Sequence, residues 1–332
     1  MSRRYNRRSS RPLEDLPSLF GEDDPDWSGV TEPSEYSESS ESSDEHTVAD
    51  RYADPGERMR FISLGSGSSG NCAYVGTDSC GLLIDGGVDN NFVTERLLRN
   101  GIDMGMVQGI LLTHDHADHV RYSYALLRRN PHMRLYATPR ALEGLLRRHN
   151  LSRRIKDYHA PIYKEHEYHF GPMTVTPFET SHDGTDNAGF CIACGSSVLV
   201  IATDMGMITE RADFYMRQAT SLVIEANYDA EMLEHGRYPE YLKSRIRGPR
   251  GHMDNAETAR YLTQITRMDR LRHIFLCHLS NDNNTPAIAL ETVSAALSER
   301  GIRLGATAAT LLPGQIYLTA LPRYETSDLY ML

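Results

Sequence analysis

The chain has 332 residues, a formal net charge of -10 and 40% hydrophobic residues, so it is long enough to bury a large apolar core. Its five cysteines are too few and too scattered for the disulfide framework of a small secreted protein. We find no apolar run long enough to span a bilayer and no signal-peptide pattern, which excludes a membrane protein and predicts a cytoplasmic one.

The first 58 residues differ in composition from the rest of the chain. Residues 1–58 hold 7 Lys+Arg against 15 Asp+Glu, whereas the remaining residues hold 28 against 30 and are nearly neutral. A segment so poor in apolar side chains cannot offset the conformational entropy that ordering would cost. We therefore expect residues 1–58 to be a disordered acidic extension, either solvated or in contact with an unidentified partner or a basic groove. Residues 59–332 are expected to form one folded domain.

A glycine- and serine-rich loop separates the first two strand patterns, and the pattern predicts a hairpin. Small residues let backbone N–H groups approach a phosphate closely, so this loop is either an ordinary turn or a phosphate site. The candidate phosphate-binding residues are Ser66, Gly67, Ser68, Ser69, Gly70 and Asn71. Residues 81–87 then have the pattern of a buried strand that ends in an acid, Asp85.

The next apolar run, residues 109–113, leads directly into His114-Asp115-His116-Ala117-Asp118-His119. Three imidazoles and two carboxylates in so short a segment cannot be buried together unless something compensates them. A divalent metal does so, because it binds neutral imidazole nitrogen and ionised carboxylate oxygen together. On a tight loop that leaves a strand, the two histidines at 114 and 116 can face one ion while Asp118 and His119 face a second. The segment therefore predicts a metal site.

Basic residues concentrate in two later segments. Residues 121–159 are mostly helical in pattern, with one helix that begins at Thr138-Pro139, and they hold ten Lys+Arg against two acidic residues. The second cluster consists of Arg237, Lys243, Arg245, Arg247 and Arg250. Each cluster is either a solvated helix face or part of an electrostatic footprint for a polyanion, so nucleic acid is a candidate partner.

Glu225 and His252 are the next two residues that could act together in catalysis. Glu225 lies in an apolar run, and His252 stands just before a helix start that Asp254 and Glu257 indicate by a capping-box pattern. A carboxylate beside a histidine would hold its tautomer and raise its basicity. The two residues are either such a pair or a buried glutamate and a loop histidine with unrelated roles.

The segment from His114 to His119 resembles the signature of the metallo-β-lactamase superfamily. A dinuclear site of that type needs three more ligands at the ends of later strands, and the chain supplies His182, Asp204 and His278 after β-like runs. We expect these strand ends to converge on one edge of a sheet, where open α/β folds place their sites. One ion is expected at His114, His116 and His182, and the other at Asp118, His119 and His278, with Asp204 bridging the two.

The same resemblance assigns roles to three further residues. Asp85 matches the superfamily's first-motif aspartate, which is not a ligand but supports the ligand loop. Phosphodiesterases of this superfamily use a Glu–His pair near the metals to protonate the leaving oxygen, which implies that role for Glu225 and His252. The candidate catalytic residues are therefore Asp118, His252 and Glu225.

Other motifs narrow the resemblance to the YycJ (WalJ) branch of the superfamily. The Gly/Ser opening at residues 63–72 and the stretch from Cys277 to Pro286 are the parts specific to that branch. The resemblance runs from about Phe61 to the final helix, and it implies an α/β fold, a four-layer αββα sandwich. It also implies two divalent metals and a DNA 5′-to-3′ exonuclease linked to mismatch repair. The acidic extension is not a family feature, and Tyr228 stands where relatives commonly have histidine.

This resemblance predicts a metal-dependent phosphodiester hydrolase. Two ions bridged by Asp204 and a water would lower the pKa of that water and generate a hydroxide nucleophile. Imidazole and carboxylate ligands without thiolate suit zinc, manganese or iron. The alternatives are a small-molecule hydrolase of the same fold, acting on a cyclic phosphodiester, thioester or lactone, and a metal-containing binding protein without turnover. The basic clusters favour DNA if they line one groove, and the complete ligand set argues against the binding protein.

Overall fold

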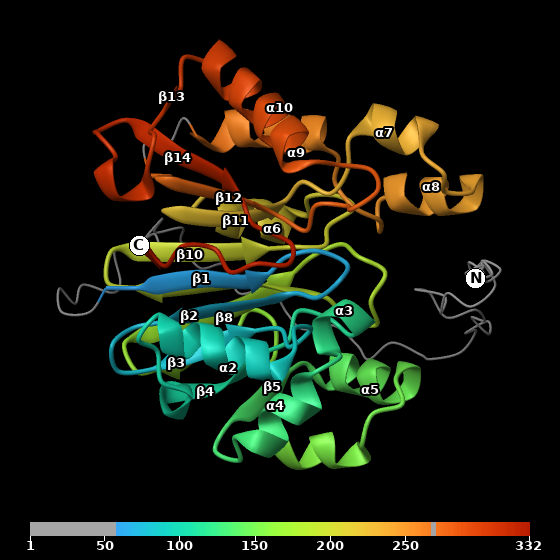
Figure 1. Ribbon diagram of the computed structural model, residues 1–332, viewed down its shortest axis with the longest axis vertical. Helices are drawn as coiled ribbons and strands as arrows, with labels where there is room; N and C mark the ends of the chain where they lie inside the picture. The colour runs from blue at the N-terminus through green and yellow to red at the C-terminus, as the bar shows by residue number, and fades with distance from the viewer. Residues whose placement is uncertain (1–57, 267–269) are drawn as a thin grey trace, which may run out of the picture. The chain divides into compact units, whose positions relative to one another are not determined.

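Two mixed β-sheets face each other at the centre of the structure, and helices cover the outer face of each sheet (Figure 1). This computed structural model describes residues 58–266 and 270–332, all within the unit Asp44–Leu332. The expected acidic extension, residues 1–58, lies outside the described residues apart from its last one. The αββα sandwich predicted from the sequence is confirmed. Among the described helices, none is long and apolar enough to cross a membrane.

The first sheet has seven strands in the order β15-β1-β2-β3-β4-β5-β6. Their bounds are β1 Arg60–Gly65, β2 Cys72–Gly76, β3 Gly81–Ile84, β4 Val107–Leu111, β5 Arg134–Ala137, β6 His159–Pro161 and β15 Tyr330–Met331. The predicted hairpin is confirmed, because β1 and β2 pair antiparallel across the Gly/Ser loop. From β3 to β6 the strands are parallel. The mostly helical pattern expected for residues 121–159 was wrong at β5, a short strand whose pairing to β4 overrides its weak local pattern.

The second sheet has eight strands in the order β13-β14-β12-β11-β10-β9-β8-β7. Their bounds are β7 Tyr168–Phe170, β8 Met173–Glu179, β9 Ala188–Cys194, β10 Ser197–Ala202, β11 Ser221–Glu225, β12 His273–Cys277, β13 Arg303–Leu304 and β14 Gln315–Ala320. Strands β10, β11, β12 and β14 are parallel neighbours. Strand β9 runs antiparallel to both β8 and β10, so β8 and β10 point the same way.

The helices lie in two groups, one on each sheet (Figure 1). On the first sheet they are α2 Asn90–Arg99, α3 Ala117–Val120, α4 Ser123–Arg129 and α5 Pro139–Arg148, with 3-10 turns η2 Met104–Met106 and η3 Arg153–Tyr158. On the second they are α6 Glu210–Met216, α7 Ala230–His235, α8 Glu240–Arg247, α9 Asn255–Ile265 and α10 Pro286–Glu299, and a 3-10 turn η5 spans Ala308–Thr310. The expected start of α5 is confirmed, because the Thr138 hydroxyl accepts the Ala141 N–H at 3.1 Å and caps the helix.

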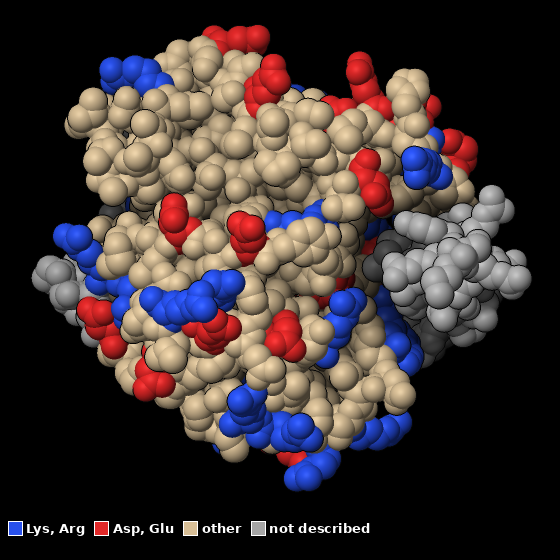
Figure 2. Space-filling model, in the orientation of Figure 1, with Lys and Arg blue, Asp and Glu red and all other residues tan. Residues whose placement is uncertain are grey.

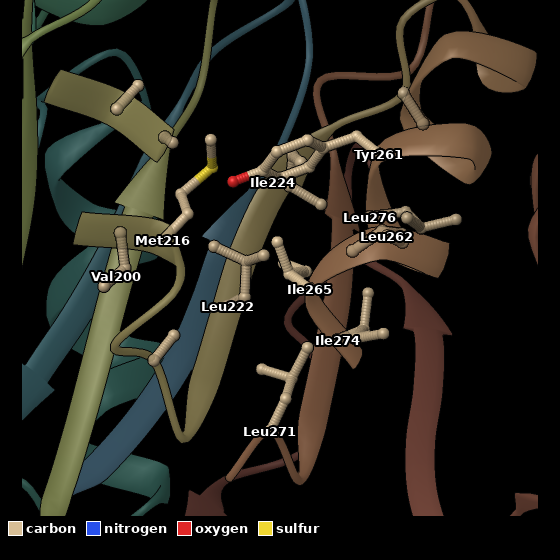
Figure 3. Packing of buried hydrophobic residues seen from close by; sticks show 14 of the residues in the cluster. Val200, Met216, Leu222, Ile224, Tyr261, Leu262, Ile265, Leu271, Ile274 and Leu276 are labelled. Carbon is tan, nitrogen blue, oxygen red and sulfur yellow. The ribbon is translucent and has the colours of Figure 1, made fainter. Parts of the chain in front are cut away.

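Apolar residues on both faces of the central strands explain the layers. In β11, Leu222 and Ile224 join the cluster under the helices, while Val223 points into the cluster between the sheets. Such strands are buried on both faces, which is why they read as continuous apolar runs in the sequence. Figure 3 shows Leu222 and Ile224 packed against Leu262 and Ile265 of α9 and Met216 of α6. This packing fixes the strands whose ends carry the polar residues.

The ligand-bearing strand ends come from both sheets. The His114–His119 segment follows β4 of the first sheet, whereas His182, Asp204 and His278 follow β8, β10 and β12 of the second. The expectation that all of them lie on one edge of a single sheet was therefore wrong. The carboxyl ends of strands in two facing sheets meet instead, which allows one centre to be enclosed from both sides.

Candidate metal centre

Three of the predicted site residues adopt an unusual backbone conformation. Asp85, Asp204 and His278 have φ angles of 63°, 52° and 54°, in the left-handed region that few residues other than glycine adopt. Each comes directly, or within two residues, after a buried strand, so the chain turns sharply as it leaves the sheet. Such conformations cost free energy, and the surrounding fold holds them where the side chain serves a site.

The structure brings all seven predicted ligands together. His114, His116 and His182 form one group whose potential ligand atoms lie within 4.8 Å of one another, and Asp118, His119 and His278 form another. Asp204 lies between them, with Oδ2 3.4 Å from Nε2 of His119 and Oδ1 3.8 Å from Nε2 of His182. This is the arrangement predicted for a bridging carboxylate between two sites, and the assignment of ligands stays a prediction.

The geometry of the first group fits an ion. Nδ1 of His116 and Nε2 of His182 are 3.2 Å apart, close to the ~3.3 Å expected for two nitrogens about 2.0–2.1 Å from one tetrahedral ion. Nε2 of His114 is buried and has no hydrogen-bond partner among the described residues. A buried, unpaired polar atom is costly unless something occupies it. Burial and the neighbouring imidazoles lower the pKa of His182 to about 4 and that of His114 well below its usual value, so both rings are neutral and ready to bind a cation.

The second group carries the negative charge. Burial disfavours the charged form of His119, but Asp85, Asp118 and Asp204 outweigh it and raise its pKa to about 9. The pKa of His278 is raised well above its usual value in the same way, by Asp204 and its other carboxylate neighbours against burial. These carboxylates attract positive charge, which protons or divalent cations can supply. The donor set as a whole therefore suits divalent metals.

Hydrogen bonds outside the ligand groups set which nitrogen each ring presents. His119 donates Nδ1–H to Oδ2 of Asp85 at 2.7 Å, and Asp85 also accepts the N–H of Thr113 at 2.8 Å. His182 donates Nδ1–H to the carbonyl of Gly251 at 2.8 Å. In both rings Nδ1 carries the proton and the lone pair is on Nε2, the nitrogen that would bind a metal. Nε2 of His119 lies 2.9 Å from Nδ2 of Asn71, and Nε2 of His182 lies 3.2 Å from Nδ1 of His116. Asp85 thus lies where the proposed supporting role requires.

Glu225 contacts two histidines with one oxygen. Its Oε1 lies 2.7 Å from Nδ1 of His252 and 2.9 Å from Nδ1 of His278. Its Oε2 accepts the backbone N–H groups of Met205 at 2.8 Å and Met253 at 3.3 Å. The predicted Glu225–His252 pair is therefore present as a contact, and the contact to His278 was not foreseen. Asp204, Glu225, His252 and His278 also form a group with ligand-type spacing, so a metal-binding role for His252 is the competing interpretation.

The Gly/Ser loop packs against the centre. The hydroxyl of Ser66 accepts the backbone N–H of His278 at 2.9 Å, and Nδ2 of Asn71 lies 2.9 Å from Nε2 of His119. The backbone N–H groups of Gly67, Gly70 and Asn71 donate within the protein, to Asn71 Oδ1 and to carbonyls of Gly67 and Asp118. Those three groups are not free for a phosphate. A phosphate-binding role stays a prediction for the rest of the loop.

Three residues of the two basic clusters contact the centre or the residues beside it. Arg148 lies 3.5 Å from Asp115 within the ligand segment, Arg245 donates to Asp183 at 2.6 Å, and Arg250 donates to the carbonyl of His182 at 3.3 Å. Lys243 cannot contribute to a basic surface for a polyanion, because it is buried and donates to the carbonyl of Glu234. On the face in Figure 2, Lys and Arg side chains are most numerous over the lower part, where α2, α4 and α5 lie.

Some residues of the site were not foreseen as such. Asp183 lies 3.2 Å from Nε2 of His116, and Asn227 donates to the carbonyl of His278 at 2.7 Å. Each stands one or two residues from a predicted site residue, and that proximity is the signal that the sequence offered. Arg323 donates to the carbonyl of Leu279 and to the hydroxyl of Ser68, and nothing in the sequence pointed to it.

Comparisons with known proteins identify a matching family and several relatives of this chain. The profile of the beta-lactamase superfamily domain matches residues 81–278. The chain is 33% identical over 249 residues to Exodeoxyribonuclease YycJ of Bacillus anthracis, covering 74% of this chain and 92% of that protein. It is 29% identical over 248 residues to Exodeoxyribonuclease WalJ of Streptococcus pneumoniae, covering 74% and 91%. The metallo-beta-lactamase fold protein YhfI from Bacillus subtilis has a similar structure, with a TM-score of 0.56 and 15% identity over 82% of this chain and 99% of that one.

The αββα sandwich with His and Asp side chains at the strand ends defines the class of protein, and the profile covers more than half of the chain. The chain therefore belongs to the beta-lactamase superfamily. Its identity to YycJ over nearly that whole protein places it in the YycJ/WalJ branch. It is a metal-dependent hydrolase.

Proposed function

We propose that this enzyme hydrolyses the phosphodiester bonds of DNA as a 5′-to-3′ exonuclease in DNA repair, with two divalent metal ions. The observation that carries the proposal is the pair of ligand groups, with Asp204 between them and His252 held beside them by Glu225. The curated relatives named exodeoxyribonucleases support DNA as the substrate. The direction and the link to repair rest on the resemblance to this branch.

In this proposal some residues bind the metal ions and another transfers a proton. One ion would be held by His114, His116 and His182. The other would be held by Asp118, His119 and His278, and Asp204 would contact both. When bound, the ions would lower the pKa of a water molecule and neutralise charge on the phosphate oxygens. Zinc, manganese and iron all suit this donor set.

His252 is proposed to protonate the departing sugar oxygen. Its Nδ1 is bonded to Glu225, so Nε2 is the nitrogen left to give a proton. The side chain is 17% exposed, so a substrate can reach the ring. Burial disfavours the charged imidazole, but Glu225 outweighs this and raises the pKa of His252, which keeps a proton available.

The test is incubation of protein loaded with zinc, manganese or iron with single- and double-stranded DNA labelled at either end. Stepwise release of nucleotides from the 5′ end is expected, and His114→Ala should abolish it. The competing function is a small-molecule hydrolase of the same fold, which the internal pairing of Lys243 and Arg245 favours. Hydrolysis of a cyclic phosphodiester, thioester or lactone without cleavage of DNA would establish that alternative.

A further inference from the structure

A cavity of about 220 Å³ lies between the Gly/Ser loop, the start of α2 and the segment after β14. Its polar and aromatic lining consists of Ser69, Asp89, Phe92, Arg121, Tyr122, Arg323 and Tyr324. The carboxylate of Asp89 caps α2, where it accepts the N–H groups of Asn91 and Phe92. Pockets for drug-sized ligands measure roughly 300–1,000 Å³. This cavity therefore suits a single small unit, such as one phosphate with part of a nucleoside, and not a longer segment of chain.

The cavity wall is continuous with the metal centre. Gly87, in the wall, donates its N–H to the carbonyl of Asn71 at 2.9 Å, and Asn71 contacts Asp118 and His119. Arg121 caps the carboxyl end of α3, the helix that carries both of those residues. Asn71 and the end of α3 thus connect the cavity wall to Asp118 and His119.

The two arginines of the cavity differ in what they bind. Arg323 is anchored, because its guanidinium donates to the carbonyl of Leu279, next to His278, and to the hydroxyl of Ser68 at 3.2 Å. Arg121 is exposed, and its guanidinium makes no ion pair or hydrogen bond with any described residue. It contrasts with Arg148 and Arg245, which are paired with carboxylates. Arg121 is thus a cation at the edge of the centre that is ready to bind an anion.

An aromatic surface accompanies this cation. The ring of Tyr324 is 66% exposed, and the guanidinium carbon of Arg323 lies 5.8 Å from its centroid. Phe92 also lines the cavity, with Arg96 over its ring at 4.8 Å. Exposed aromatic rings beside basic groups are the combination on which unpaired bases stack, since every base has a π face.

We infer that this cavity is a subsite for one nucleotide unit of the DNA strand, next to the phosphodiester that is cleaved. Arg121 binds the phosphate of that nucleotide, and Tyr324 stacks on its base. This inference rests on the proposed DNA hydrolysis and adds to it where the strand is held. Ions at the ligand groups would bind any phosphodiester, whereas this subsite distinguishes a nucleotide from a simple ester.

The test compares Arg121→Ala and Tyr324→Ala with Arg128→Ala. Arg128 is a matched control because it lies in the same basic segment, is exposed on α4 and does not line the cavity. The metal-loaded proteins are assayed on labelled DNA, on DNA with an abasic nucleotide at the terminus, and on bis(nitrophenyl) phosphate, which has no base. Calorimetry measures the binding of deoxyadenosine monophosphate to the same proteins.

Arg121→Ala is expected to lower the ratio of DNA to ester turnover by about 10- to 100-fold, mainly through KM, since a charged hydrogen bond is lost. Tyr324→Ala should lower kcat/KM on normal DNA by about 5- to 100-fold but have little effect on abasic DNA. Arg128→Ala should resemble the wild type. The subsite is refuted if Arg121→Ala matches Arg128→Ala in nucleotide binding, or if Tyr324→Ala affects both DNAs equally. Nucleotide binding that depends on Arg121 in a protein that leaves DNA intact would instead refute only the proposed function.

Discussion

Replacement of His252 by alanine separates proton donation from metal binding. Nδ1 of His252 lies 2.7 Å from Oε1 of Glu225. It lies 3.8 Å from Oδ1 of Asp204, the predicted bridging ligand. Its removal should therefore leave close to two ions per protein. Turnover of DNA should fall by about 10²- to 10⁴-fold, which is the usual contribution of a positioned proton donor to the rate.

The magnitude should depend on the leaving group. A sugar alkoxide needs a proton as it departs, whereas a nitrophenolate does not, so bis(nitrophenyl) phosphate should be affected far less. The assay measures kcat for both substrates together with metal content by atomic absorption. His132→Ala is the matched control, because this histidine is exposed on the turn between α4 and β5 and forms no hydrogen bond or ion pair with the described residues of the centre.

Two results would contradict the reasoning. Loss of an ion in His252→Ala would show that His252 is a ligand, as its spacing to Asp204 and His278 allows. An equal loss of turnover on both substrates would show that the ring positions the phosphate or the nucleophile and does not protonate the leaving group.

Three further variants or conditions test the centre. His114→Ala should remove bound metal and DNA cleavage together, and chelation of the wild type should lower its Tm, because metal stabilises only the folded state; an unchanged Tm would argue against resident ions. Asp85→Asn should weaken metal affinity by about 10- to 100-fold, since His119 loses its carboxylate partner at 2.7 Å. Titration with a competing chelator measures this affinity. Asp78→Asn, on an exposed turn, is the control. DNA affinity should fall steeply with salt as phosphate contacts release counterions; a flat response between low and physiological salt would favour a small-molecule substrate.

The sequence was most informative where chemistry and strand pattern coincide. The His114–His119 segment and the apolar runs before His182, Asp204 and His278 are local signals, and parallel strands bring their ends together. The same signals did not show that two sheets contribute, because the pairing partners of β4 and β10 are set by tertiary packing. Strand β5 was missed for the same reason, since Arg134–Ala137 has little β pattern of its own.

Residues that act through distant contacts were beyond the reach of local patterns. Arg323 meets Ser68 and Leu279 only because the chain returns past the Gly/Ser loop after β14. Lys243 was assigned to a basic surface by its charge, yet its ammonium group is buried against the carbonyl of Glu234. Charge in a sequence shows how many cations are present, and the fold decides which of them are free.

Glu225 contacts both His252, the proposed proton donor, and His278, a predicted metal ligand. Replacement of Glu225 by glutamine should therefore affect metal content and turnover differently from removal of His252. Oε2 accepts two backbone N–H groups, so a glutamine must place its oxygen there and its NH₂ toward His252 and His278. Both rings would then have to accept at Nδ1 and carry hydrogen on Nε2.

In that tautomer, Nε2 of His278 cannot bind a metal and Nδ1 faces the amide. Glu225→Gln should therefore reduce the metal content from two ions toward one, and its loss of turnover should extend to bis(nitrophenyl) phosphate. Metal analysis and kinetics on both substrates, beside His252→Ala, measure this. If Glu225→Gln kept both ions and matched His252→Ala on each substrate, the carboxylate would act through His252 alone and the contact with His278 would have no consequence for metal binding.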